Sequence, residues 1–181
     1  MAVIDSRITY ELLQQMPEDG KRYELIDGDI FVSPSPIPRH QRTVSNFDIM
    51  LRAVEQRGYG QAFIAPLDVV FDEYNVAEPD ALFIVTERLH IITYTNIQGA
   101  PDLLVEVLSD GTAHRDVGVK LHMYARFKVP HYWVADAAEQ SLQRYELRGE
   151  RYSELPKLYL DDAFTCPLFP EIDVRVAELF G

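Results

Sequence analysis

The sequence has few of the features that mark secreted, membrane-embedded or disulfide-stabilised proteins. It contains a single cysteine, Cys166, so an intramolecular disulfide is impossible and a cytoplasmic location is expected. No apolar run approaches the length of a membrane span, which excludes a transmembrane helix. The first residues carry charges early and lack a long apolar stretch, so no signal peptide is expected.

The sequence also lacks the patterns of several common catalytic sites. Ser109 and His114 suggest nucleophilic catalysis, but no Gly-x-Ser-x-Gly motif surrounds Ser109, and Ser-Asp-Gly-Thr is typical of turns. Cys166 lies beside Pro167 without a CxxC motif, which counts against thiol catalysis and against a zinc site. A glycine-rich phosphate-binding loop is missing as well.

Positive charge is scarce, because 17 Lys and Arg residues stand against 29 Asp and Glu residues and the formal net charge is −12. This balance counts against broad binding of nucleic acids, which usually requires a basic surface. Local basic residues and a metal ion can still offset the field around a small site. The 181 residues, of which 47% are hydrophobic, suit one globular domain over residues 1–181.

A strand with a carboxylate inside it is the most informative stretch. Residues 103–108 form an apolar run bounded by Pro101 and a Ser-Asp-Gly turn, which predicts a strand buried on both faces. Glu106 lies within this run. An isolated buried carboxylate costs roughly several kcal/mol unless a partner or a metal compensates it. Glu106 is therefore expected to have a cationic partner.

The segment that follows, residues 112–128, predicts a helix on which Asp116, Lys120 and Tyr124 are four apart and share one face. A strand that turns directly into a helix can bring Lys120 back toward Glu106. The alternative for Lys120 is an exposed i,i+4 salt bridge with Asp116, worth about 0.3–0.5 kcal/mol.

The remaining patterns predict an α/β fold, a mixed β-sheet flanked by helices with extra β-hairpins. Helices are expected at residues 9–16, 39–57 and 174–180. Strands are expected at residues 22–26, 29–32, 61–65, 67–71, 81–85, 131–135, 142–148 and 151–155, with a polar loop at 72–75 and a loop or short helix at 87–97. Asp27-Gly28 predicts a tight hairpin turn between the first two strands.

A second acid precedes the apolar run at residues 81–85. Asp80 follows Pro79 there, so Asp80 and Glu106 can lie at the ends of neighbouring strands. Hard cations prefer oxygen ligands, and Mg²⁺ needs only one or two carboxylates because it keeps several waters. The pair therefore indicates a site for a hard divalent cation. The alternative is a turn aspartate together with a glutamate in a structural ion pair.

The ordered set of motifs resembles one branch of the PD-(D/E)xK nucleases, the Uma2 family of restriction-endonuclease-like proteins. The matching positions run in order through most of the chain: Tyr23 to Gly28 (YELIDG), Pro34-Ser35-Pro36 with His40, Pro79-Asp80, Gly99 to Ser109, Asp116/Lys120/Tyr124 and Tyr132-Trp133. In the usual nuclease motif the lysine stands two residues after the acid, where this chain has Leu108. Lys120 would supply that group from the helix instead.

The resemblance implies a restriction-endonuclease-like fold and a Mg²⁺- or Mn²⁺-dependent hydrolysis of DNA phosphodiester bonds. It implies Asp80, Glu106 and Lys120 as catalytic residues and Glu24 as an accessory metal ligand beside Asp80 and Glu106. His40 and Tyr124 are expected as substrate contacts, although each can also be a packed residue.

Two functions are compatible with these patterns. One is an active endonuclease, for which Arg39, Arg42, Arg115 and Lys120 are the basic residues expected near the substrate. Cleavage of both DNA strands would favour a homodimer, because two-fold pairs are the commonest oligomers. The other is a nuclease-fold binding or regulatory module without catalysis, which the acidic charge favours. The sequence leaves the target and the choice between DNA and RNA open.

Overall fold

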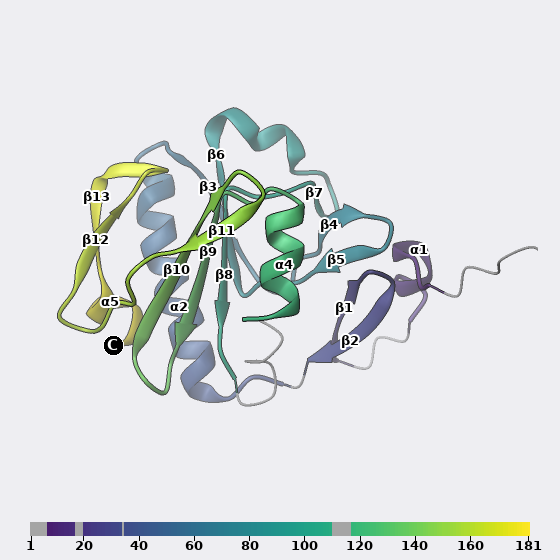
Figure 1. Ribbon diagram of the computed structural model, residues 1–181, viewed down its shortest axis with the longest axis horizontal. Helices are drawn as coiled ribbons and strands as arrows, with labels where there is room; N and C mark the ends of the chain where they lie inside the picture. The colour runs from purple at the N-terminus through teal and green to yellow at the C-terminus, as the bar shows by residue number, and fades with distance from the viewer. Residues whose placement is uncertain (1–6, 17–19, 34, 110–116) are drawn as a thin grey trace, which may run out of the picture.

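The computed structural model describes residues 7–16, 20–33, 35–109 and 117–181. Its largest feature is a six-stranded mixed sheet of order β11-β10-β9-β8-β6-β3 (Figure 1). The strands are β3 (Gly60–Ile64), β6 (Ala81–Val85), β8 (Leu103–Val107), β9 (His131–Asp136), β10 (Ser141–Arg148) and β11 (Arg151–Glu154). Strand β8 lies inside the sheet, parallel to β9 and antiparallel to β6. The predicted pairing of the Glu106 strand with the strand after Asp80 is confirmed.

A second sheet of five short strands has the order β2-β1-β5-β4-β7, and a third is the hairpin β12-β13. Their strands are β1 (Arg22–Ile26), β2 (Asp29–Ser33), β4 (Val69–Asp72), β5 (Asn75–Ala77), β7 (Ile97–Gln98), β12 (Ala163–Cys166) and β13 (Phe169–Arg175). The helices are α1 (Tyr10–Leu13), α2 (Pro38–Gln56), the 3₁₀ helix η1 (Thr86–Ile91), α4 (Val119–Arg126) and α5 (Val176–Phe180). The predicted mixed sheet with helices and hairpins is confirmed.

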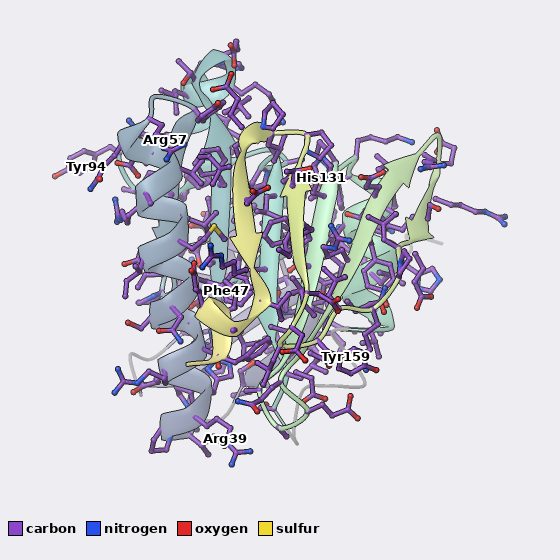
Figure 2. All side chains as sticks on the ribbon, turned by 90° about the vertical axis from the view of Figure 1, so that its left-hand side faces the viewer. Arg39, Phe47, Arg57, Tyr94, His131 and Tyr159 are labelled. Atoms are coloured by element: carbon purple, nitrogen blue, oxygen red, sulfur yellow. The ribbon has the colours of Figure 1, made fainter. Side chains whose placement is uncertain are left out.

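Helix α2 covers one face of the six-stranded sheet. Side chains alternate across a strand, so Leu103, Val105 and Val107 of β8 all point to the same face. They pack there with Phe47 and Leu51 of α2 in one buried cluster. Figure 2 shows Phe47 directed from the helix toward the sheet. The cluster therefore buries the apolar side of the helix predicted at residues 39–57.

Helix α4 lies against the opposite face of the same sheet (Figure 1). Leu104 of β8 packs there in a second buried cluster with Met123 and Tyr124 of α4. Glu106 has the same parity along β8 as Leu104, so its side chain points to the α4 face. The strand pattern thus aims the carboxylate at the helix that carries Lys120.

Several short elements differ from the expectation. Residues 61–65 and 67–71 can be interpreted from the sequence as one strand or as a hairpin interrupted by Pro66, but β3 and β4 belong to different sheets. The expected polar loop at 72–75 contains the start of β5, which pairs with β4 through a two-residue turn. The C-terminal segment forms the hairpin β12-β13 before α5. The sequence did not predict this hairpin, because prolines at 167 and 170 are unusual within strands. Strands β4, β5 and β12 have only three or four residues, so their tertiary partners define them more than local pattern does.

The expected loop or short helix at residues 87–97 contains the 3₁₀ helix η1 and the start of β7. The predicted helix at 112–128 is described from Val119 to Arg126 as α4. Expectations for Pro34, His114, Arg115 and Asp116 lie outside the described residues.

The hairpin β1-β2 turns as its sequence predicts. Asp27 has a φ of 54° and Gly28 a φ of 86°, the positive values that a two-residue hairpin turn requires. A Cβ atom at Gly28 would lie 2.4 Å from the Cβ atom of Arg7. Glycine at this position therefore satisfies both the backbone conformation and the close approach of the N-terminal segment.

We expect Gly28→Ala to lower the free energy of unfolding more than Gly58→Ala does. Both glycines have positive φ, but open space surrounds Gly58. The strain of positive φ costs about 1 kcal/mol at either site, and the contact with Arg7 adds about 1–3 kcal/mol at Gly28. Urea denaturation of the two variants measures the difference. Equal losses would show that the Arg7 segment moves away without cost.

Candidate active site

Asp80 and the end of β8 lie together because of strand register. Ala81 pairs with Val105 in the antiparallel β6-β8 ladder, so the residue before β6 lies at the end where β8 finishes. The backbone N–H of Val107 donates to Asp80 Oδ2 over 2.9 Å. This bond fixes the Asp80 carboxylate beside the residue that follows Glu106.

Two cationic or ionisable side chains from distant parts of the chain hold the Asp80 carboxylate. Arg22 Nη1 of β1 lies 2.9 Å from Oδ1, and His40 Nε2 of α2 lies 3.1 Å from Oδ2. Burial by itself disfavours the ionised form of Asp80. The hydrogen bond and charge of His40, the charge of Arg22 and the Val107 N–H outweigh burial, so the pKa of Asp80 is lowered. Asp80 is therefore held as a buried carboxylate.

Glu106 is 3% exposed and is bound from helix α4. Lys120 Nζ and the Tyr124 hydroxyl each donate to Glu106 Oε1 over 2.8 Å. The predicted contact between Lys120 and Glu106 is confirmed. Lys120 is itself 3% exposed, so the alternative of an exposed helix salt bridge does not describe it.

Glu24 brings the second sheet into the same site. It lies on β1 and its Oε1 is 2.8 Å from Lys120 Nζ, so one ammonium contacts the carboxylates of both Glu24 and Glu106. Glu24 Oε1 also accepts the backbone N–H of Glu78 over 2.9 Å. The group thus unites side chains from β1, β8 and α4.

Tyr124 and His40 occupy different positions from those of simple substrate contacts. Tyr124 is fully buried, and burial together with the neighbouring Glu106 raises the pKa of its hydroxyl well above the usual value. Its bond to Glu106 makes it a side chain that orients the carboxylate, in place of the expected substrate contact. His40 is 5% exposed, but it lines a cavity as well as bonding Asp80.

A cavity of about 640 Å³ opens beside Asp80. Its polar lining includes Lys21, Arg22, His40, Gln41 and Glu78. Sequence reasoning missed Lys21, Arg22 and Glu78 as residues of the site.

A signal for Arg22 was present in the sequence. Arg22 precedes Glu24 by two positions on one strand, so both side chains must lie on the same face. The expected basic residues Arg39 and Arg42 instead line a separate cavity of about 260 Å³, together with Gln140 and Phe180.

The donor set fits a hard divalent cation. Over the described residues, no set of three or more His, Cys, Asp or Glu side chains is arranged to enclose a metal ion. Mg²⁺ does not require such a set, since it binds through one or two carboxylates and retains waters. Asp80 and Glu106 supply carboxylates at one end of neighbouring strands, and Glu24 adds a third nearby. Soft ligands are not part of this group, which disfavours a zinc or copper site.

A comparison with known families assigns the chain to one of them. A family model, Uma2, described as "Putative restriction endonuclease", matches residues 10–177. The chain belongs to the Uma2 family. A search of curated proteins gave no match.

A solved structure has the same fold as this Uma2 chain. It is the crystal structure of a protein from Anabaena variabilis described as a putative nuclease belonging to DUF820. The TM-score is 0.77 at 22% sequence identity, over 96% of this chain and 97% of that chain. The match shows a shared fold. No helix in the described part of the Uma2 chain has the length and apolar character needed to cross a membrane.

Glu78 is a further, half-buried acid of the Uma2 site. Its Oε2 atom is buried and has no hydrogen-bond partner among the described residues. Burial, followed by the charges of Asp68 and Glu24, raises the pKa of Glu78 to about 7, against the opposing charges of Arg22 and Lys120. Between its ordinary pKa and this raised pKa, Glu78 is therefore mostly protonated in the folded protein and mostly ionised in the unfolded chain.

We expect Glu78→Gln to stabilise the protein at pH 8 and to have little effect at pH 4. The unfolded carboxyl ionises above its ordinary pKa of 4.5, while the folded one stays protonated up to about 7, so the wild type loses stability through this window. The gain at pH 8 is about 1–2 kcal/mol, after a reduction for partial solvent screening. Urea denaturation at both pH values measures it, with exposed Glu73→Gln as the matched control. A gain that is equal at both pH values would contradict the assignment.

Proposed function

We propose that this Uma2 protein is a metal-dependent endonuclease that hydrolyses DNA phosphodiester bonds. The observation that carries the proposal is the buried Glu106 carboxylate, held by Lys120 and Tyr124 beside the buried Asp80. A strand that had only to support the core would be more stable with an apolar residue at that position, because buried ion pairs seldom stabilise more than apolar packing. Family membership and the nuclease-like fold support the same conclusion.

Asp80 and Glu106 would hold a Mg²⁺ or Mn²⁺ ion, with Glu24 as an accessory ligand. When bound, the ion would polarise the phosphate and lower the pKa of a coordinated water. The lowered pKa of Asp80 keeps that ligand ionised at neutral pH. The Val107 N–H holds the Asp80 carboxylate against the backbone beside Glu106. Binding of the ion would draw the two carboxylates toward one another.

Lys120 would act as the cationic group of catalysis. Its ammonium lies 2.8 Å from Glu106 Oε1 and is close enough to orient an attacking water beside that carboxylate. It would also stabilise the negative charge that develops on the phosphate in the transition state. Tyr124 would position Glu106, and His40 would orient Asp80 while facing the substrate cavity.

The non-catalytic alternative has one observation in its favour. Every acid proposed as a ligand already has cationic or hydrogen-bond partners: Arg22 and His40 on Asp80, and Lys120 on Glu24 and Glu106. A binding module could retain these pairs for stability alone. A homodimer, suited to cutting both strands, stays a prediction for either function.

We expect wild-type protein to cleave plasmid or single-stranded DNA in Mg²⁺ or Mn²⁺, and Glu106→Gln to abolish cleavage. Glutamine keeps the shape of the side chain and its carbonyl still accepts from Lys120 and Tyr124, but it lacks the charge that binds the ion. Lys120→Met should lower the rate by about 10²- to 10³-fold, the range for loss of one charge-stabilising group.

The matched control for this assay is Glu154→Gln, which removes a carboxylate at an exposed position of the edge strand β11. It should cleave like the wild type. Absence of cleavage by wild type with either metal would favour the non-catalytic module. Equal cleavage by wild type and Glu106→Gln would indicate a contaminating nuclease.

Metal binding has a signature that does not depend on activity. A ligand that binds the folded state stabilises it by RT ln(1 + [L]/Kd), about 1.4 kcal/mol at nine times Kd. We expect millimolar Mn²⁺ to raise the melting temperature of wild type by several degrees, roughly 2–6 °C, and to leave Asp80→Asn and Glu106→Gln unchanged. Differential scanning calorimetry with and without Mn²⁺ measures this. An equal rise in all three proteins would place the ion elsewhere.

A further inference from the structure

The Arg22 side chain has unused hydrogen-bonding capacity at the proposed site. Within the described part of the chain, its guanidinium hydrogen-bonds only to Asp80, through Nη1. A guanidinium carries five N–H donors in a planar fork. The side chain is 24% exposed and lines the cavity of about 640 Å³. Its remaining donors are therefore available on the side from which a substrate enters.

The contact between Arg22 and Asp80 would compete with metal binding. Arg22 occupies Asp80 Oδ1, one of the oxygens proposed to hold the ion. Placing a divalent cation on the same carboxylate sets two positive charges close together, which is unfavourable in a partly buried site. The conflict is relieved when the guanidinium turns from Asp80 toward an anion in the cavity.

The chemistry of the fork selects the anion. Guanidinium forms two parallel hydrogen bonds with phosphate oxygens, with more geometric specificity than an ammonium provides. The cavity has room for a nucleotide-sized group, since binding pockets of small ligands span about 300–1,000 Å³. Its lining joins Arg22 on β1 to Gln41, Ser45 and Asp48 on α2, so the cavity extends from Asp80 along both elements.

We infer that Arg22 binds a phosphate group of the nucleic-acid substrate and that the adjoining cavity holds the nucleotide attached to it. The inference rests on the proposed function and adds a substrate-binding residue to it. Arg22 would exchange its Asp80 partner for the phosphate as metal and substrate enter together. Lys21 and Arg22 are the basic side chains of a lining that also contains Asp48, Glu78 and Asp80, so the phosphate would be held by these two cations and by the metal on the acids.

The test measures binding of a fluorescein-labelled single-stranded oligonucleotide by anisotropy, in Ca²⁺ in place of Mg²⁺ and over a range of salt concentrations. Arg22→Gln should weaken binding by about 10- to 100-fold, the effect of losing a hydrogen bond to a charged group. It should also reduce the slope of log affinity against log salt by about 0.7, the value for one phosphate contact on a single strand. A purely structural role for Arg22 would leave that slope unchanged.

Two further variants keep the test decisive. Arg22→Lys retains the ion pair with Asp80 and hence the fold, keeps the salt slope, and should weaken binding by about 3- to 10-fold because the planar fork is lost. Arg57→Gln removes an exposed arginine at the end of α2 opposite Arg39 (Figure 2) and should bind like the wild type. Melting temperatures of all variants check that each is folded.

The outcomes separate the inference from the proposed function. Wild type that binds or cleaves, with an unchanged slope in Arg22→Gln and unchanged affinity in Arg22→Lys, would overturn the inference and leave the nuclease proposal intact. Wild type that neither binds nor cleaves nucleic acid would overturn both. In the cleavage assay Arg22→Gln should raise KM more than it lowers kcat, and a loss confined to kcat would contradict a binding role.

Discussion

The buried Lys120 ammonium, shared by Glu24 and Glu106, is the interaction on which the arrangement of the site depends. Removal of three charges from water is costly, and only close pairing within the protein offsets it. The pairing fixes α4 above β8 through Lys120 and Tyr124, and it draws β1 toward the same point. Loss of the ammonium would leave two carboxylates buried beside each other, so the lysine is structural as well as proposed to be catalytic.

A second set of contacts positions Asp80 independently. Arg22, His40 and the Val107 N–H reach its two oxygens from β1, α2 and β8. Because these partners come from both faces of the central sheet, the carboxylate cannot shift without disturbing several elements. Such support is what precise placement of a reactive group requires. The two acids are thus held by separate networks that meet at one end of β6 and β8.

The proposed substrate requires this acidic chain to offset negative charge at the site. The net charge of −12 belongs to the whole chain, and the cavity beside Asp80 is lined by Lys21 and Arg22 as well as by Asp48 and Glu78. Arg39 and Arg42, which the sequence suggested for this role, line a different cavity. In a partly enclosed site, a bound divalent cation together with Lys21 and Arg22 would offset the nearby carboxylates, while salt screens the distant ones. Binding would then depend on this cavity and on the metal more than on a broad basic surface.

Local pattern determined much of the fold and part of the site. The apolar run around Glu106 identified a central strand, the helical pattern of residues 39–57 identified α2, and Asp27-Gly28 identified the β1-β2 turn. The four-residue spacing of Lys120 and Tyr124 placed both on one helix face, and that face does meet Glu106. These features depend on the spacing of apolar residues and on turn stereochemistry. Both are properties of a few neighbouring residues and can be read from the sequence. The short strands β5, β7 and β12 carry too few residues to show a period, and Pro170 interrupts the pattern of the longer β13.

Tertiary structure alone decided which distant groups meet. Arg22 and Asp80 are 58 positions apart, and nothing in the spacing of the sequence joins them. The same holds for Lys120 and Glu24, which belong to different layers of the molecule until β1 packs beside α4. The partner of the Tyr124 hydroxyl was also not predictable from the sequence. In the folded protein the side chain is buried, and the hydroxyl donates to Glu106. The sequence determines the periodicity of each element. Packing determines the partners of the buried charges, because a buried charge must be paired and only the folded layers decide which side chains lie close to it.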